Sequence, residues 1–293
     1  MTTQSAGKEK TGKAGRIAGK IVMYAVLVIA CLIVIIPILY VLLGAFKTEE
    51  ELVNNSAFAL PESWSFASFK EALSMQDSTR TYSIMLRGFR NTALLIVVCC
   101  FGTIMTGTMT AFVVQRFNTI LSRTVKGAFL VAVLLPNISM QVTVYQILNK
   151  MHLVGTIWGP MILWIGTDIT SIYIFIQFLS QISVSLDESG IIDGASYPRI
   201  YWSIILPNLK PAVATVLIMK FVTIYNDFYT PKLYMPDDQP VVSTVLLNLN
   251  NATTVSYSTV FAAVILCILP TLIIFLFLQK YIYSGLVSGA VKE

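Results

Sequence analysis

The amino-acid sequence predicts an all-α integral membrane protein with about six transmembrane helices. Of its 293 residues, 56% are hydrophobic and 12% are charged, whereas a soluble domain carries about 25% charged residues. The mean hydropathy is +0.74. Several apolar runs reach the roughly 20 residues that a helix needs to cross a hydrocarbon core about 30 Å thick. This composition excludes an ordinary water-soluble domain.

The first apolar run, residues 21–46, follows a basic tail at residues 1–20. The run exceeds the roughly 7 to 15 residues of a signal-peptide core and no small-residue cleavage motif follows it, so we interpret it as a retained transmembrane helix. Prolines in later spans, such as Pro136, are tolerable because neighbouring helices can satisfy the freed backbone groups. The five further predicted spans are 91–114, 127–148, 157–182, 211–229 and 260–281.

The predicted spans also define the organisation of the chain. An extracytoplasmic loop occupies residues 47–90, a core domain with five spans occupies 91–281, and a cytoplasmic tail occupies 282–293. Placing both termini in the cytoplasm puts more Lys and Arg residues on that side than outside, as the positive-inside rule requires. We therefore predict a multi-pass protein of the cell membrane with cytoplasmic termini.

Several kinds of chemistry are excluded. The four cysteines lie in hydrophobic runs rather than in loops, so a disulfide framework is not expected, and with His152 as the only histidine no residues stand at metal-ligand spacing. The dispersed cations form no basic face for nucleic acid. No Gly-rich loop ends in Gly-Lys-Ser or Gly-Lys-Thr, so this chain is not expected to bind ATP. We predict no catalytic residue, no metal and no cofactor in this chain.

The long loop at 183–207, cytoplasmic in this topology, is predicted to contain short helices outside the bilayer. Ser185 and Glu188 are spaced as a capping box. The Asp193–Gly194 pair predicts a sharp turn, and Pro198 is suited to the first turn of a second helix.

Two interpretations of this loop remain open from the residues alone. Leu186, Ile191 and Ile192 could form a compact apolar surface that docks in a groove of another protein. Alternatively, the loop could rest on lipid headgroups through the aromatic residues of 197–202, as interfacial amphipathic segments do.

A resemblance distinguishes between them. From Leu186 to Pro207 the loop resembles the Glu-Ala-Ala signature of binding-protein-dependent ABC importer permeases, with an acidic residue, small residues, Asp-Gly-Ala-Ser and a later Leu-Pro in the same order. Lys210-Pro211, Tyr225-Asn226-Asp227 and the segment 279–292 look like the maltose-type carbohydrate branch of this family. Two departures are Glu188-Ser189-Gly190 in place of Glu-Ala-Ala, and Tyr225 in place of the usual Trp.

The resemblance implies the type I ABC importer fold and a partner set. The partners would be a second permease subunit, which is a different chain in the maltose-type branch, two ATPase subunits that bind ATP and Mg, and an extracytoplasmic solute-binding protein that delivers a sugar or oligosaccharide. By the same resemblance the loop would be a coupling helix that fits a cleft on the ATPase and converts its closure into alternating access. The coupling residues would be Leu186, Asp187, Glu188, Ile191, Ile192, Asp193, Gly194 and Ala195.

Polar residues within spans usually face the helix bundle or a watery cavity. Those of the third, fourth and fifth spans could line the solute path or could simply tie helices together. The candidates for the path are Asn137, Gln141, Tyr145, Asp168, Ser171, Lys220 and Asn226. In the second span, Thr103, Gly107 and Ala111 repeat every four residues, which predicts close packing of a neighbouring helix.

Asp168 and Lys220 fall at similar depths, about 18 Å and about 14 Å from the inner boundary at about 1.5 Å per residue. Since a lone charge near the midplane costs at least about 2.5 to 3.5 kcal/mol, we predict that they form an ion pair. In the alternative, Lys220 extends towards water and Asp168 bonds Thr167, Ser171 or another subunit.

Three alternative functions differ in how well they fit the sequence. An ion-coupled secondary transporter often shows inverted repeats, which are not recognisable here, and the loop at 183–207 would have no role in it. An ABC importer of a solute other than a sugar would share every feature described. An intramembrane enzyme lacks a constellation of acid, base and nucleophile.

Overall fold

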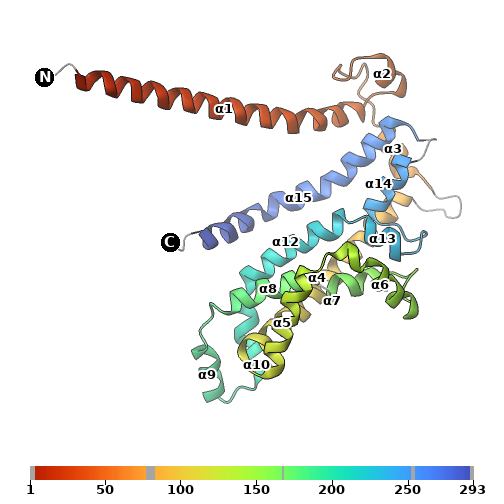
Figure 1. Ribbon diagram of the computed structural model, residues 1–293. Helices are drawn as coiled ribbons and strands as arrows, with labels where there is room; N and C mark the ends of the chain where they lie inside the picture. Colours follow the sequence, from red (N-terminus) through yellow and green to blue (C-terminus); the bar gives the residue numbers. More distant parts are fainter. Residues whose placement is uncertain (1–3, 77–82, 167, 252–254, 291–293) are drawn as a thin grey trace. The chain divides into compact units, whose positions relative to one another are not determined.

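The computed structural model describes residues 4–76, 83–166, 168–251 and 255–290, and for 4–18, 137–138, 251, 278 and 280–290 it describes the backbone alone. All regular elements in the described residues are helical (Figure 1). In chain order they are α1 (Gln4–Gly44), α2 (Glu49–Asn54), α3 (Ala67–Ser74), α4 (Ile84–Arg116), α5 (Ile120–Leu134), α6 (Asn137–Lys150), α7 (Trp158–Gly166), α8 (Ile169–Leu179), α9 (Ser185–Ile192), α10 (Tyr197–Ile200), the π-helix η1 (Tyr201–Ile205), α11 (Leu206–Asn208), α12 (Lys210–Asn226), α13 (Tyr229–Tyr234), α14 (Val242–Asn251) and α15 (Tyr257–Ala290).

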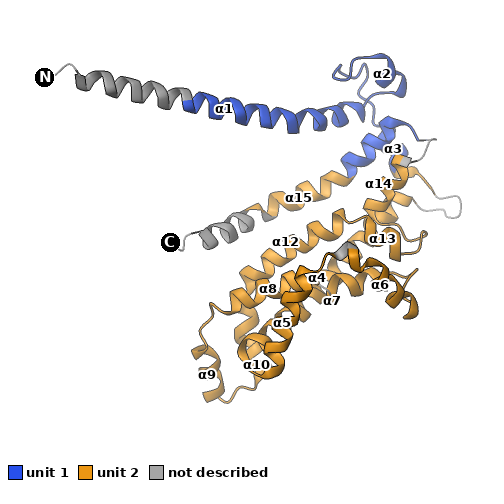
Figure 2. Ribbon diagram, in the orientation of Figure 1, with its two compact units in different colours: residues 1–72, 254–266 blue, residues 73–253, 267–293 orange. Residues whose placement is uncertain are grey.

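The chain divides into two compact units, which Figure 2 colours separately. Residues 1–72 and 254–266 form the first unit, and residues 73–253 and 267–293 form the second. The second unit contains every residue that the sequence marked for coupling or for the solute path.

The described helices agree with six spans by length and composition. Four are long and apolar enough on their own, and two bent helix pairs raise the number to six. The four are Gly19–Gly44 of α1, Ile84–Arg116, Trp158–Leu179 across α7 and α8, and Tyr257–Phe277 of α15. The predicted fold class is therefore confirmed, although two of these spans are helix pairs bent by more than 40°.

The third predicted span, 127–148, was expected to be one helix and is broken instead. Its two parts, α5 and α6, are bent by 117° relative to each other. Leu135 has an extended conformation with ψ of 126°, and Pro136 is the N-cap of α6. The reason is that a proline disfavours helical geometry at the preceding residue and lacks the N–H that would continue the ladder.

The boundaries of the first outer loop also differ from the prediction. Helix α4 begins at Ile84, seven residues before the predicted start at 91, because the Ser83 hydroxyl accepts a hydrogen bond from Leu86 N. Within the loop, Thr48 and Glu51 form a capping box that starts α2. Exchanged hydrogen bonds of this kind satisfy free N–H groups of the first turn.

In the first unit, a buried lysine organises the chain after α1. The side chain of Lys47 is almost inaccessible to solvent, and its Nζ donates to the carbonyl oxygens of Ser56 at 3.1 Å and Ala57 at 3.3 Å. Tyr40 of α1 packs edge-on against Phe261 of α15, with ring centroids 5.4 Å apart.

Helix α4 is a central element of the second unit, because two apolar clusters among its described residues include residues of α4. Ala111 and Phe112 pack with residues of α8, η1 and α12, among them Phe175. Leu95 and Cys99 pack with Trp164 of α7 and with residues further along the chain.

The predicted small-residue ridge on α4 is confirmed. Thr103, Gly107 and Ala111 are all buried, and a Cβ atom added at Gly107 would lie 2.9 Å from the ring of Phe175 in α8. The close approach of α4 and α8 therefore depends on the missing side chain at Gly107.

We expect Gly107→Leu to separate α4 from α8 and to lower the free energy of unfolding by about 1 to 3 kcal/mol, because overpacking forces side chains and backbone to shift. The measurement is the thermal midpoint of the purified protein in detergent. Gly127→Leu in α5 is the matched control, since nothing lies within 4 Å of its added Cβ. An equal loss in both variants would contradict the packing role.

Candidate functional site

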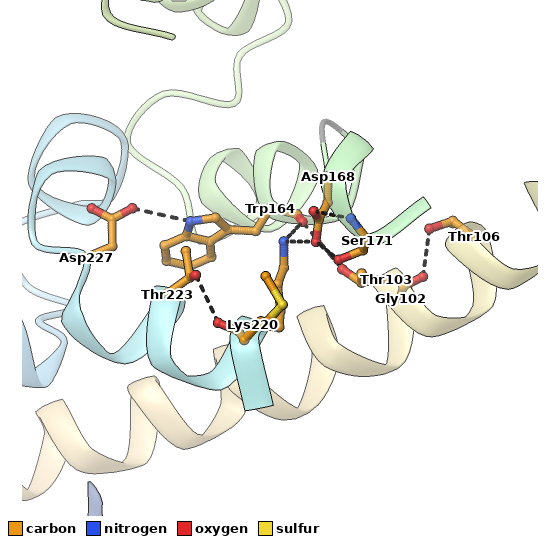
Figure 3. Close-up of polar contacts among 10 residues, drawn as sticks. Gly102, Thr103, Thr106, Trp164, Asp168, Ser171, Lys220, Thr223 and Asp227 are labelled. Atoms are coloured by element: carbon orange, nitrogen blue, oxygen red, sulfur yellow. Dashed lines mark hydrogen bonds and ion pairs between the residues drawn. The ribbon is translucent and has the colours of Figure 1, made fainter. Parts of the chain in front are cut away.

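The Lys220 ammonium lies where α7, α8 and α12 meet, in the interior of the second unit (Figure 3). Its Nζ is 2.8 Å from Asp168 Oδ2, and it also donates to the backbone carbonyl of Trp164. The two charged side chains are 7% and 15% exposed. The ion pair predicted from the sequence is therefore present, and the alternative in which Lys220 extends towards water is wrong in this structure.

This site exists because the fourth span is interrupted. Helix α7 ends at Gly166 and α8 begins at Ile169, with Asp168 as its N-cap. The carboxylate accepts from Ser171 N at 3.1 Å and from Ser171 Oγ at 2.6 Å. Such caps satisfy donors that have no partner within the helix. Thr167, named in the alternative, lies outside the described residues.

The free carbonyl at the end of α7 is satisfied from two other helices. Trp164 O accepts from Lys220 Nζ of α12 and from Thr103 Oγ1 of α4 at 3.4 Å. The indole Nε1 of Trp164 donates to Asp227 Oδ2 at 3.3 Å, just beyond the end of α12. The sequence did not indicate these contacts to the Trp164 carbonyl, because every residue type has the same backbone carbonyl group.

The path candidates of α6 form a separate group around Tyr234. Gln141 Nε2 donates to the Tyr234 hydroxyl at 3.2 Å, and the rings of Tyr145 and Tyr234 are 5.9 Å apart. Burial raises the pKa of the Tyr234 hydroxyl. Asn226 is exposed, and its side chain donates to Val222 O. The side chain of Asn137 lies outside the described residues.

The segment 183–207 forms the short helices that were predicted, with one correction at its start. The capping box between Ser185 and Glu188 is absent, since Val184 is the N-cap of α9 and no side chain caps it. Ser183 Oγ instead accepts from Ser185 N at 3.2 Å. The chain turns before Ser185, so this residue is already inside the helix. Pro198 lies in the first turn of α10, as predicted.

The predicted coupling residues are divided between an exposed and a buried face. Leu186 and Ile191 are about half exposed, and Ile192 at the end of α9 is 85% exposed. Glu188 and Asp193 are also exposed, Ala195 is half-buried, and its N–H donates to Gly190 O. Gly194 has a φ of 78°, which confirms the turn and requires a residue without a Cβ.

The lipid-headgroup alternative loses one of its three aromatic residues. Tyr201 is buried, and its hydroxyl lies 2.7 Å from Thr108 Oγ1 of α4. Tyr197 and Trp202 remain about half exposed. The tyrosine therefore ties η1 to α4 and is not available to lipid.

Asp187 was predicted on the coupling surface but is buried against α4. Its Oδ2 lies 2.7 Å from Arg116 Nε. No spacing rule links residues 71 positions apart, so the sequence could indicate only that a buried acid needs a cation. Within the described residues, no group of three or more His, Cys, Asp or Glu side chains is placed to hold a metal ion.

Comparisons with known proteins agree on one family. Residues 103–287 match the family model described as binding-protein-dependent transport system inner membrane component. A starch degradation products transport system permease protein, AmyC of Thermoanaerobacterium thermosulfurigenes, described as probable, is 28% identical over 91% of this chain and 94% of its own. The galactooligosaccharides transport system permease protein GanQ of Bacillus subtilis is 27% identical, with 92% and 94% covered.

The fold is similar to that of a chain in the crystal structure of a bacterial ABC transporter involved in the import of the acidic polysaccharide alginate. The TM-score is 0.79 at 18% sequence identity, with 92% of this chain and 97% of that chain covered. The similarity extends over nearly the whole of both chains, so the described helices form the fold of an ABC importer membrane subunit.

We expect Asp168→Asn alone to reduce stability by about 3 to 5 kcal/mol, because a buried lysine loses its counter-charge. The double variant Asp168→Asn with Lys220→Met should recover part of this loss, since no charge is then stranded. The measurement is the yield and thermal midpoint of the purified protein.

Asp237→Asn is the matched control for this experiment. It breaks the Lys232–Asp237 pair, whose side chains are 49% and 91% exposed, and exposed pairs contribute about 1 kcal/mol or less. Equal damage from the single and double variants at the buried pair would show that pairing has no energetic role.

Proposed function

Because the chain belongs to the family of binding-protein-dependent transport system inner membrane components, we propose that it is a permease subunit of an ATP-driven importer for a sugar or an oligosaccharide. The observation that carries the family is the match over residues 103–287, which includes the loop at 183–207 and the last four spans. The sugar specificity is supported by relatives similar over nearly their whole length, which are named for starch degradation products and for galactooligosaccharides.

The proposed ATPase contact is the exposed face of α9 and the turn that follows it. Leu186, Ile191 and Ile192 present apolar side chains to solvent, next to the exposed carboxylate of Glu188. An apolar centre with a charged rim is the ordinary composition of a protein interface. Closure of two ATPase subunits, which bind ATP and Mg, would move this face and so drive alternating access.

The remaining partners follow from the same proposal. A second permease subunit, a different chain, would complete the channel, and an extracytoplasmic solute-binding protein would deliver the solute. The proposed orientation places both termini and α9 in the cytoplasm, in agreement with the basic tail at 1–20.

The proposed solute path involves the two polar groups of the second unit. Gln141 and Tyr145 lie beside Tyr234, and Asp168, Ser171 and Lys220 satisfy one another. The first group, with Asn137 and Asn226, is suited to hydrogen-bond sugar hydroxyls. The second is internally neutralised and is suited to line the path without attracting ions.

The decisive experiment is reconstitution of the complete importer in liposomes, with uptake of maltotriose and raffinose measured as a function of internal ATP. We expect uptake that requires ATP hydrolysis and the solute-binding protein. Uptake that persists with a hydrolysis-deficient ATPase and follows an ion gradient would establish a secondary transporter. ATP-dependent uptake of some other solute, with no sugar bound in calorimetry of the binding protein, would support the permease role and refute the proposed sugar specificity.

We expect Gly194→Val to uncouple ATP hydrolysis from transport while leaving insertion intact. The added Cβ has open space, but a β-branched residue held at φ of 78° costs about 1 to 3 kcal/mol of backbone strain. The strain should deform the turn at the end of α9.

Gly155→Val is the matched control, because Gly155 has a φ of 77° and equally open space in the loop between α6 and α7. Both variants should lose similar thermal stability, and only Gly194→Val should lower solute transported per ATP. Normal transport by Gly194→Val in an intact complex would refute the role of this turn.

A further inference from the structure

Arg116, the last residue of α4, contacts both ends of the segment that joins α8 to α9. Its Nη2 donates to Ile182 O at 3.0 Å, just after α8, and its Nε lies 2.7 Å from Asp187 Oδ2, in the first turn of α9. The Arg116 guanidinium therefore joins the end of α4 to Ile182 and Asp187, the two ends of this segment.

This ion pair is buried, unlike the exposed pair of the outer loops. The side chains of Arg116 and Asp187 are 8% and 10% exposed, whereas those of Lys232 and Asp237 are 49% and 91% exposed. Asp187 Oδ1 has no hydrogen-bond donor among the described residues. The carboxylate depends on Arg116 for its compensation, and loss of one member of such a buried pair is far more damaging than loss of an exposed one.

The packing of α9 at Gly190 is apolar. Gly190 faces the side chains of Ile200 and Ile204, with a Cβ position 3.2 Å from both. Contacts between alkyl groups depend little on orientation, so they would permit α9 to slide on α10 and η1. The Arg116 contact differs, because Nη2 donates a directional hydrogen bond to Ile182 O while Nε forms an ion pair with Asp187 without hydrogen-bond geometry. A planar guanidinium can hold both partners at once.

We propose that Arg116 is a positioning residue that fixes the orientation of α9 relative to α4, so that a displacement of α9 moves α4 as well as α8. The inference rests on the proposed docking of an ATPase at α9 and adds to it a mechanical connection through α4. Helix α4 also carries Thr103, which donates to Trp164 O beside the Lys220–Asp168 pair. Arg116 thus connects the docking face with the site of the buried lysine.

The first test measures solute transported per ATP hydrolysed by the complete importer. Arg116→Met should lower this ratio about 2- to 30-fold, the range found for mutations that alter coupling between sites. Lys232→Met, which removes the exposed ion pair, should leave the ratio unchanged.

The double variant Arg116→Met with Asp187→Leu separates positioning from mere stability. Removing both charges should restore the amount of assembled complex, but the ratio should remain low because an alkyl contact does not fix an orientation. Recovery of both the assembly and the ratio in the double variant would overturn the proposal. Arg116→Lys should recover only part of the ratio, since an ammonium lacks the planar fork.

The second test does not require an ATPase. Spin labels at the exposed positions Arg123 and Ser196, placed in a Cys31→Ser background, report the distance between the start of α5 and the turn after α9. Cys31 is the one exposed cysteine among the described residues, so the label reaches only the chosen positions. Arg116→Met should broaden the distance distribution of the full chain in nanodiscs, and Lys232→Met should not.

An equally narrow distribution in Arg116→Met would overturn the positioning role. Failure of the ATPase to bind the unmodified chain would instead refute the proposed function and leave the distance result in place. The two failures are therefore distinguishable.

Discussion

Burial of the Lys220 ammonium among α7, α8 and α12 is the constraint on which the second unit depends. In a hydrocarbon environment each polar group must be satisfied within the protein. Lys220 meets this requirement with a carboxylate and a backbone carbonyl that are both available only because the fourth span is interrupted. The break in the helix and the buried charge thus require each other, and together they fix where α12 crosses α7 and α8.

Helix α4 connects the buried ion pair with the loop at 183–207. It approaches α8 closely at Gly107, contributes Thr103 to the polar junction, binds Tyr201 of η1 through Thr108, and ends at Arg116 beside α9. Polar contacts therefore occur along one rigid helix from the buried ion pair to the loop at 183–207. A membrane subunit that transmits force from an ATPase needs a stiff element of this kind, since apolar helix contacts alone have little directional preference.

Irregular backbone interrupts several helices of the second unit. Pro136 separates α5 from α6, α7 ends at Gly166 while α8 begins at Ile169, and the π-helix η1 precedes the bend into α12. The π-helix follows from Pro207, which has no N–H to donate to the previous turn, while Leu206 N bonds back to Tyr201 O. Breaks at membrane depth persist only where protein groups satisfy the freed carbonyls and amides, as Lys220 and Thr103 do for Trp164.

The sequence by itself determined the helical membrane class, the short helices of the loop at 183–207 and the Asp168–Lys220 pair, because hydrophobic length, turn residues and the cost of a lone buried charge are all properties of residue type. It placed Gly194 correctly, since only glycine suits a turn of positive φ. The bend at Pro136 follows from the missing N–H of a proline that the sequence displayed. The early start of α4 and the turn before Ser185 were decided by local hydrogen bonds to Ser83 and Ser183 that the spacing of residues did not reveal. The partners of Trp164 O and the pairing of Arg116 with Asp187 were decided by tertiary structure alone, because they join groups distant in the chain whose proximity arises only when the helices pack.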